Sequence, residues 1–262
     1  MPKNKELLNE IKSKIKNVII YQNIEFDDFS LKVKNQRNSP SIRLQLFDNI
    51  DLKNKTVYDL GCSNGFFCYE LAKRGAKVIG VDKNKKTIEL NRLIAKYYDL
   101  DIEFIEDDLL DESFYNDRME NSDLVIFLSV IHHIYKNTEK YPSNYCNKIL
   151  KIISEKTDKM IFETGQSGEP FHWSIKLGEM GLNPQKWILD NWLWNTNFKQ
   201  KDVIKSLLFR GRMGAIREKV CTLYRKSIYK PYHPLRYYFI NLIYRLFIRD
   251  PRETRYIFIC SK

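Results

Sequence analysis

One stretch, Val57–Phe67, constrains the fold more than any other part of the chain. It reads VYDLGCSNGFF, which is a short apolar strand, a turn with two glycines and the start of a helix. A second apolar stretch, Lys77–Asp82, follows it and ends in an acid. A glycine turn lets the backbone approach a ligand closely, and an acid after the second strand can hold a ribose diol. Together these features predict a bound nucleoside.

Apolar strands and amphipathic helices alternate along the rest of the chain, a pattern typical of a parallel sheet with helices on both faces. We therefore expect an α/β fold with a doubly wound, mostly parallel, seven-stranded Rossmann-like sheet. The strands are expected near residues 55–60, 77–82, 102–106, 123–128, 158–163, 200–204 and 255–260. The helices are expected near residues 65–74, 84–98, 111–118, 143–156 and 184–195.

The length of 262 residues suits one large α/β domain with additions. In residues 5–20, apolar side chains share one helical stripe with lysines opposite, which favours a helix packed on the core over one lying on a membrane. Residues 42–50 resume helical spacing. We expect an N-terminal helical extension over 1–50, the core over 51–205, a basic aromatic helical insert over 206–252 and the last core strand over 253–262.

The composition indicates the cellular compartment and the class of binding partner. The five cysteines are scattered without a C-x-x-C pair, so neither a disulfide framework nor a structural zinc site is predicted. The sequence shows neither a signal-peptide pattern nor a run of roughly 20 apolar residues, and we expect a cytoplasmic protein. Residues 199–262 carry 16 Lys and Arg against 4 Asp and Glu, which favours a polyanion, a phosphate group or a membrane surface as partner.

The turn after the first strand discriminates between nucleosides. A dinucleotide site has the pattern G-x-G-x-x-G, whereas here Ser63 stands between Gly61 and Gly65. Asp59, just before the turn, would repel a pyrophosphate but suits a cationic amino-acid group. The site therefore favours a nucleoside with a positively charged amino-acid tail over NAD.

With these residues the chain resembles the class I S-adenosylmethionine-dependent methyltransferases, closely over 55–165 and more loosely over 184–204 and 253–260. The matching motifs are Asp59–Gly65, Asp82 after the second strand, Phe104–Asp108 and Asp123–Val130. Ser63 departs from the middle glycine of many members. The resemblance implies that S-adenosylmethionine is the cofactor, with Gly61 and neighbouring backbone at its methionine part, Asp82 at the ribose hydroxyls and Asp108 at the adenine edge. Its expected contacts are Asp59, Gly61, Cys62, Ser63, Asn64, Gly65, Asp82, Lys83, Asp107, Asp108, Leu109 and Ser129. Asp108 could instead cap the helix after it.

Methyl transfer is an in-line displacement, so the protein must align the acceptor and, for an alcohol, remove its proton. Two histidines follow the fourth strand at the crevice, and neutral histidine can act as the base. We favour His133 as the catalytic base, with His132 second; the alternative is that both only shape the pocket wall. Glu163, at the end of the fifth strand, is a further catalytic candidate, although it could instead bind a substrate hydroxyl or cap the strand.

No metal site is predicted. A carboxylate–imidazole site from His132 or His133 with Glu163 and His172 is the less favoured alternative, because the spacing alone is a weak signal.

The acceptor must be recognised outside the common core. The available segments are 21–45, with Lys34, Arg37 and Arg43; the loop 164–183; and 206–252, rich in arginine and tyrosine. Arginine binds phosphate in fork geometry, which suits a phosphorylated or nucleotide-linked acceptor. The simpler interpretation of 206–252 is a solvated basic helical lid.

Three functions fit these features. The first is an O-methyltransferase acting on a sugar or phosphate of a nucleotide-linked or phosphorylated surface-glycan (capsule or lipopolysaccharide) precursor, since Trp187–Ile204 also resembles glycan-cluster methyltransferases and a wobble-uridine tRNA group. The second is an RNA methyltransferase, since basic charge with interleaved aromatics suits single strands. The third is a non-enzymatic protein that contacts a membrane surface through Leu235–Ile248. Nothing in the sequence indicates the oligomeric state.

Overall fold

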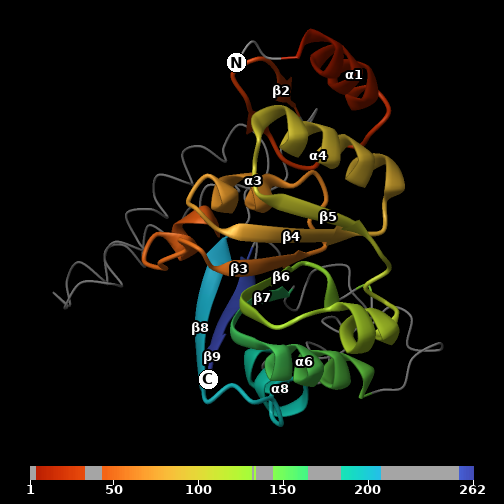
Figure 1. Cartoon of the computed structure of the whole chain (residues 1–262). Coiled ribbons are helices and arrows are strands. Elements are labelled where there is room, and N and C mark those ends of the chain that lie inside the picture. The colour runs from red at the N-terminus through yellow and green to blue at the C-terminus, as the bar shows by residue number, and fades with distance from the viewer. Residues whose placement is uncertain (1–3, 33–42, 132, 134–143, 165–183, 208–253) are drawn as a thin grey trace, which may run out of the picture.

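A computed structural model describes residues 4–32, 43–131, 133, 144–164, 184–207 and 254–262. Its centre is a seven-stranded sheet in the order β5-β4-β3-β6-β7-β9-β8 (Figure 1). The strands are β3 (Thr56–Leu60), β4 (Lys77–Asp82), β5 (Ile102–Glu106), β6 (Ser122–Leu128), β7 (Thr157–Thr164), β8 (Gln200–Leu207) and β9 (Thr254–Ser261). The first five run parallel, whereas β9 is antiparallel to both β7 and β8. The predicted mostly parallel seven-stranded Rossmann-like sheet is confirmed.

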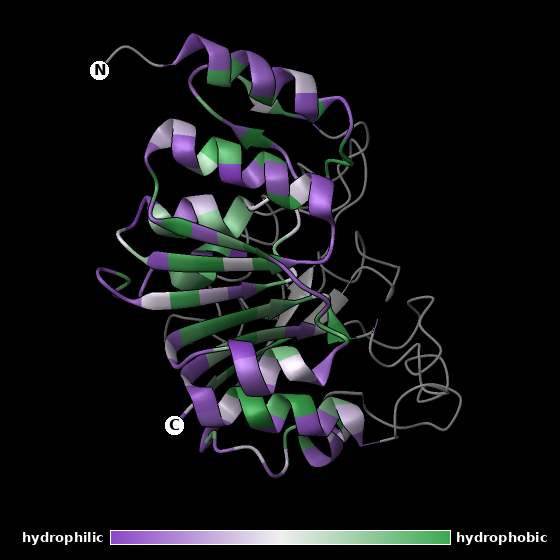
Figure 2. Cartoon of the chain, turned by 45° about the vertical axis from the view of Figure 1, so that its right-hand side comes forward, coloured by the Kyte–Doolittle hydropathy of each residue, from purple (hydrophilic) through white to green (hydrophobic). Residues whose placement is uncertain are grey.

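Helices cover both faces of the sheet, which is why its central strands are apolar on both sides (Figure 2). Tyr58, Val125 and Phe162 pack with α6 and α8 on one face. Val57, Ile126 and Ile161 belong to the core of the other face, which includes α3, α4 and the N-terminal extension. The helices are α3 (Phe66–Ala72), α4 (Lys85–Tyr98), α6 (Tyr145–Lys156) and α8 (Pro184–Asn191).

Three predicted elements differ in extent. The helix expected at 111–118 is a single π-helical turn, η2 (Phe114–Arg118), and α8 ends at Asn191 rather than near 195. Strand β8 continues to Leu207 because its full length pairs with β9. The rest of the predicted insert lies outside the described residues, as does Leu235–Ile248. Within the described part of the chain, no helix is long and apolar enough to cross a membrane.

The N-terminal extension contains more than the predicted helix. Helix α1 (Lys5–Ile15) is capped by Asn4, whose side chain accepts from the Glu6 and Leu7 amides, and it ends five residues before the predicted boundary at 20. An unpredicted antiparallel pair, β1 (Ile24–Glu25) and β2 (Ser30–Leu31), follows. The helical spacing seen at 42–50 yields only a short 3-10 turn, η1 (Gln45–Phe47).

An aromatic cluster fastens this extension to the core. Phe26 stacks on Tyr98 of α4 with ring centroids 5.0 Å apart and meets Tyr69 of α3 edge-on at 5.2 Å. Phe29 stacks on Phe26 at 4.8 Å. The short β1–β2 pair therefore gains its stability from aromatic packing on α3 and α4, since two strands alone are marginal.

We expect Phe26→Ala to lower the free energy of unfolding by about 2–3 kcal/mol, because it removes ring contacts to three aromatic residues. Urea unfolding followed by circular dichroism measures the change. Ile19→Ala is the control, since Ile19 is 66% exposed and its loss should cost less than about 0.5 kcal/mol. Equal effects of the two variants would contradict the assigned role of the cluster.

Candidate functional site

The carboxyl ends of β3, β4, β5, β6 and β7 meet at one edge of the sheet. Strand order reverses beside β3, which pairs with β4 on one side and β6 on the other. In doubly wound sheets such a reversal opens the ligand crevice. The site residues predicted after these strands therefore lie around one edge.

The turn after β3 has an unusual backbone. Gly61, Ser63 and Gly65 all have positive φ, at 82°, 48° and 74°. The Gly61 and Cys62 amides donate to the Val81 carbonyl at 2.8 and 3.0 Å, which ties the turn to the end of β4. A Cβ on Gly61 would collide with the Val130 Cγ2 atom, so glycine is required there both for conformation and for space.

Ser63, the departure from the glycine pattern, adopts the left-handed conformation all the same. Its amide donates to Asp82 Oδ2 at 3.0 Å, and its carbonyl accepts from Asn91 Nδ2 at 2.7 Å. Asn91 is fully buried and is itself held by the Tyr69 hydroxyl, which donates to Asn91 Oδ1 at 3.1 Å. These bonds hold a conformation that costs roughly 1 kcal/mol or more for a residue with a Cβ.

Asp82 faces the turn from the end of β4. In addition to the Ser63 contact, its Oδ1 atom accepts from the Asn84 amide at 2.9 Å. A carboxylate offers about four acceptor positions, so these bonds orient Asp82 and leave capacity for hydroxyl donors. Lys83 beside it is exposed. The geometry fits a ribose diol next to the turn.

Asp59, only 4% exposed, sits beneath the turn. Burial, with a smaller contribution from the charge of Asp82, raises the pKa of Asp59 to about 7, although a hydrogen bond from Cys68 Sγ at 3.2 Å opposes the shift. Burial also raises the pKa of the Cys62 and Cys68 thiols, so neither is an activated nucleophile. A carboxyl near its ionisation point suits an adjacent cation.

The side chain of Asn64, which was predicted to contact the cofactor, bonds to the N-terminal extension. This side chain is 1% exposed, accepts from the Tyr21 amide at 2.8 Å and donates to the Ile19 carbonyl at 3.2 Å. The side-chain amide group of Asn64 therefore binds the backbone of the N-terminal extension. Ile19 and Tyr21 project their side chains into solvent, at 66% and 59% exposure.

The acids after β5 divide into a buried and an exposed one. Asp107 is buried, pairs with Arg118 at 2.7 Å and donates its amide to the Asp82 carbonyl at 3.1 Å. Asp108 is exposed and its Oδ1 atom accepts from the Leu110 amide at 3.0 Å, a local turn rather than a helix cap. Leu109 is buried, and its carbonyl accepts from the Tyr115 hydroxyl at 2.9 Å.

The residues after β6 and β7 depart most from expectation. Glu163 is completely buried, and Arg43 donates to both of its carboxylate oxygens, from Nε at 2.6 Å and from an Nη atom at 2.7 Å. Arg43 was predicted to recognise the acceptor, but it is only 3% exposed and paired inside the protein. The same geometry argues against Glu163 as a base, since an arginine-paired carboxylate is a poor proton acceptor.

His133 is exposed after β6, and its amide donates to the Val130 carbonyl at 2.8 Å. Ser129 lies between β6 and His133, half-buried. His132 and His172 lie outside the described residues, so the alternative metal site does too. Within the described residues, no group of three or more His, Cys, Asp or Glu could hold a metal ion.

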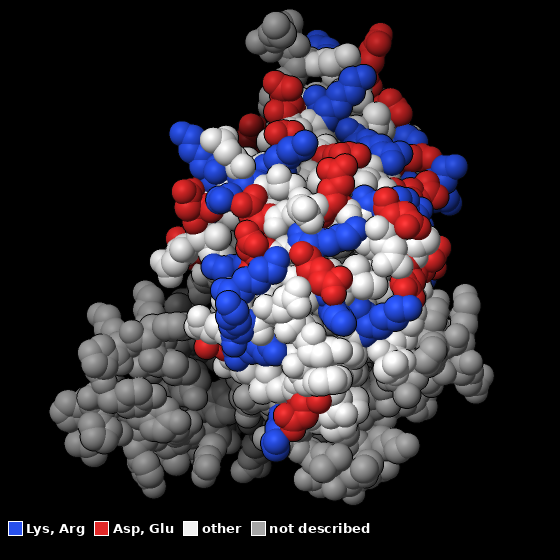
Figure 3. All heavy atoms as spheres, turned by 60° about the horizontal axis from the view of Figure 1, so that its bottom comes forward, with Lys and Arg blue, Asp and Glu red and all other residues white. Residues whose placement is uncertain are grey.

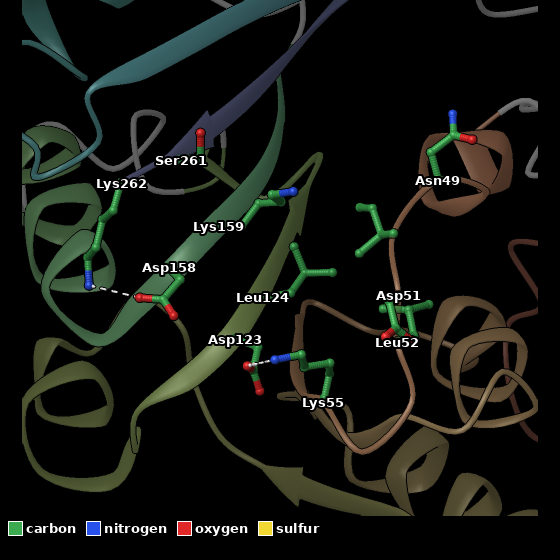
Figure 4. A pocket seen from close by; sticks show the side chains of 11 residues that line it. Asn49, Asp51, Leu52, Lys55, Asp123, Leu124, Asp158, Lys159, Ser261 and Lys262 are labelled. Carbon is green, nitrogen blue, oxygen red and sulfur yellow. Dashed lines mark hydrogen bonds and ion pairs between the residues drawn. The ribbon is translucent and has the colours of Figure 1, made fainter.

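A hollow opens at the edge opposite the predicted site, among the amino ends of β3, β6 and β7 (Figure 4). Its charged side chains include two ion pairs, Lys55–Asp123 at 2.8 Å and Lys262–Asp158 at 3.5 Å. On the face shown in Figure 3, the described acidic and basic side chains are likewise interspersed. None of the site residues predicted from the sequence lines this hollow.

Comparisons with known proteins agree with this geometry. A family model described as a methyltransferase domain matches residues 51–166. An O-antigen chain terminator bifunctional methyltransferase/kinase, WbdD of Escherichia coli, is 31% identical over 170 residues, which cover 60% of this chain and 22% of that protein. A tRNA U34 carboxymethyltransferase of Helicobacter pylori is 26% identical over 132 residues, covering 50% of this chain and 49% of that protein.

The structural similarity to known proteins extends beyond the residues that match in sequence. A solved structure of the bifunctional kinase-methyltransferase WbdD covers 96% of this chain and 46% of that chain, with a TM-score of 0.61 and 20% sequence identity. The chain thus spans less than half of that structure. Residues 51–166, with their strand–turn–helix motif and the acid after β4, form a methyltransferase domain of the class I S-adenosylmethionine-dependent family.

Proposed function

We propose that the protein is an O-methyltransferase that modifies a sugar or phosphate group of a nucleotide-linked or phosphorylated surface-glycan precursor in the cytoplasm. The observation that carries this proposal is the similarity to WbdD, whose name links its methyltransferase to O-antigen chains. The proposal concerns the methyl acceptor, because the family already accounts for the methyl donor.

An RNA methyltransferase is the second candidate. The match to a tRNA U34 carboxymethyltransferase supports it, over half of each chain. One feature favours the glycan acceptor: the identity to WbdD is higher and extends over a longer stretch.

The crevice residues take the following roles in this proposal. The backbone of Gly61, Cys62, Ser63 and Gly65 lines the methionine part of the cofactor. Asp59 faces its cationic amino group, Asp82 binds the ribose hydroxyls, and Asp108, with Asp107 and Leu109 behind it, borders the adenine. Ser129 and Lys83 complete the rim.

S-adenosylmethionine supplies a methyl group already activated by the sulfonium charge. The chain itself must then orient the acceptor oxygen and accept its proton where that oxygen is a hydroxyl. We assign proton acceptance to His133, which stands exposed at the end of β6 on the same edge as the turn. A phosphate acceptor would be ionised already and would need no base.

We expect Asp82→Ala to weaken S-adenosylmethionine binding by about tenfold or more, because it removes the ribose contact and a bond that holds Ser63. Titration calorimetry measures the affinity. Asp190→Asn is the control, because it breaks an exposed ion pair of α8 and should leave binding unchanged. An Asp82→Ala variant with wild-type affinity would exclude this pocket.

Cofactor binding should depend on pH through Asp59. A cation beside Asp59 favours the carboxylate, so below pH 7 binding must displace a proton, and affinity should rise with pH until Asp59 is ionised. The ionised fraction of a group with pKa about 7 predicts a gain of roughly eightfold from about pH 6 to about pH 7.5. Calorimetry across this range tests it, and Asp59→Asn should flatten the profile. A flat wild-type profile would separate Asp59 from the cationic group.

The acceptor is tested with methyl-labelled S-adenosylmethionine and separate pools of sugar nucleotides, phosphorylated sugars and total RNA. We expect label in one of the sugar pools, and label in RNA alone would overturn the proposal. Phosphatase treatment of the labelled product then distinguishes the atoms, because a methylated terminal phosphate is a diester that a phosphomonoesterase leaves intact.

The variant His133→Gln tests the proposed catalytic base in the same assay. For a hydroxyl acceptor we expect turnover to fall by about a hundredfold while cofactor affinity stays within about twofold, since a positioned base contributes at least that much. Unchanged turnover would remove His133 as the base.

A further inference from the structure

A buried ion pair connects two segments that are 120 residues apart in the sequence. The side chains of Arg43 and Glu163 are 4% and 0% exposed, and the guanidinium meets both carboxylate oxygens in fork geometry. Glu163 is the penultimate residue of β7, so the pair lies at the carboxyl edge of the sheet. This is the edge that carries the cofactor turn.

The same carboxylate holds a strained residue of the neighbouring strand. Ser129 follows β6 and has φ of 62°, a conformation that residues with a Cβ seldom adopt. Its hydroxyl donates to Glu163 Oε1 at 2.8 Å, and its amide donates to the Glu163 carbonyl at 3.1 Å. Glu163 thus fixes both the side chain and the backbone of Ser129.

The direction of the chain after Ser129 decides where the next residues lie. Val130 packs directly over the Cα atom of Gly61, so closely that only glycine fits in the cofactor turn. The Val130 carbonyl then accepts from the His133 amide. A change in the Ser129 backbone would move Val130 against the turn and His133 with it.

We propose that Glu163, held in place by Arg43, is a positioning residue that sets the Ser129–Val130 bend and thereby the shape of the cofactor turn. The inference rests on the proposed cofactor pocket but not on the identity of the acceptor. Glu163 then positions the backbone and does not act as a base. Arg43 of the N-terminal extension contributes by holding the Glu163 carboxylate in place.

Its buried position distinguishes the Arg43–Glu163 pair from an ion pair that only attaches the N-terminal extension to the core. Lys14 and Glu89 also join the extension to the core, at 3.0 Å, but they are 36% and 40% exposed on α1 and α4. Desolvation offsets most of the attraction within a buried pair, so burial of Arg43 and Glu163 adds little stability over apolar packing. What the buried pair adds is a carboxylate of fixed orientation beneath a strained turn.

The test measures S-adenosylmethionine affinity by calorimetry in full-length variants, so it needs no acceptor. We expect Glu163→Gln to weaken binding at least fivefold, with Glu89→Gln as the matched control that breaks the exposed pair and leaves affinity unchanged. Combining Glu163→Gln with Ser129→Gly should recover most of the lost affinity, because glycine adopts positive φ without support.

Two results would overturn the proposal: wild-type affinity in Glu163→Gln, or no recovery in the double variant. Should Glu163→Gln fail to fold, Ser129→Ala tests the same connection with the ion pair intact. It keeps the strained backbone and loses the hydroxyl bond, so affinity should fall at least threefold, and unchanged affinity would refute the role of Glu163. If the cofactor pocket itself is wrongly assigned, Asp82→Ala will also bind S-adenosylmethionine normally, which distinguishes that outcome from failure of the Glu163 role alone.

Discussion

The parallel alignment of β3 with β4 and β6 is the constraint on which the rest of the structure depends. In this register Leu60 pairs with Val81, so the turn after β3 emerges beside the end of β4. The Gly61 and Cys62 amides then reach the Val81 carbonyl, and the Ser63 amide reaches the Asp82 carboxylate. A slip of one residue would turn every side chain of the strand to the other face and separate Asp82 from the turn. The geometry for binding a nucleoside is therefore a consequence of strand pairing.

The sequence predicts this part of the molecule well because the information is local. Short apolar runs, glycines in a turn and acids at strand ends act within a few residues, and they place β3, β4 and Asp82 close to where the structure has them. The last strand was also predicted, because residues 255–260 are strongly apolar, but its antiparallel direction and its place between β7 and β8 were not. The β1–β2 pair was not, because two-residue strands leave almost no periodicity and depend on Phe26 packing against α4.

The Arg43–Glu163 pair could not be predicted for a different reason. Arg43 stands near the start of a segment with helical spacing, where an arginine is expected on the exposed face, and nothing near it in the sequence shows that it is buried. A charge enters the interior only when a partner is already there, and the partner lies 120 residues away. Removing one member of such a pair typically costs about 3–5 kcal/mol, because the other charge is left unpaired. Position at the carboxyl edge of a sheet therefore does not imply exposure to the crevice: Glu163 lies at that edge and is completely buried against Arg43.

Two kinds of residue lie at the carboxyl edge of the sheet. The donor side rests on backbone held in left-handed conformations, at Gly61, Ser63, Gly65 and Ser129, each fixed by bonds or by close packing. Backbone of this kind cannot be altered one side chain at a time without losing the pocket, so it suits the invariant cofactor. The side chains of His133 and Tyr21, by contrast, are exposed, so they can change without disturbing the sheet. Asn64 and Arg43 tie the N-terminal extension to the same edge of the sheet, so the extension and the turn after β3 are structurally linked. A core of this fold can carry different acceptor sites, because function depends on the residues of the site and not on the fold itself.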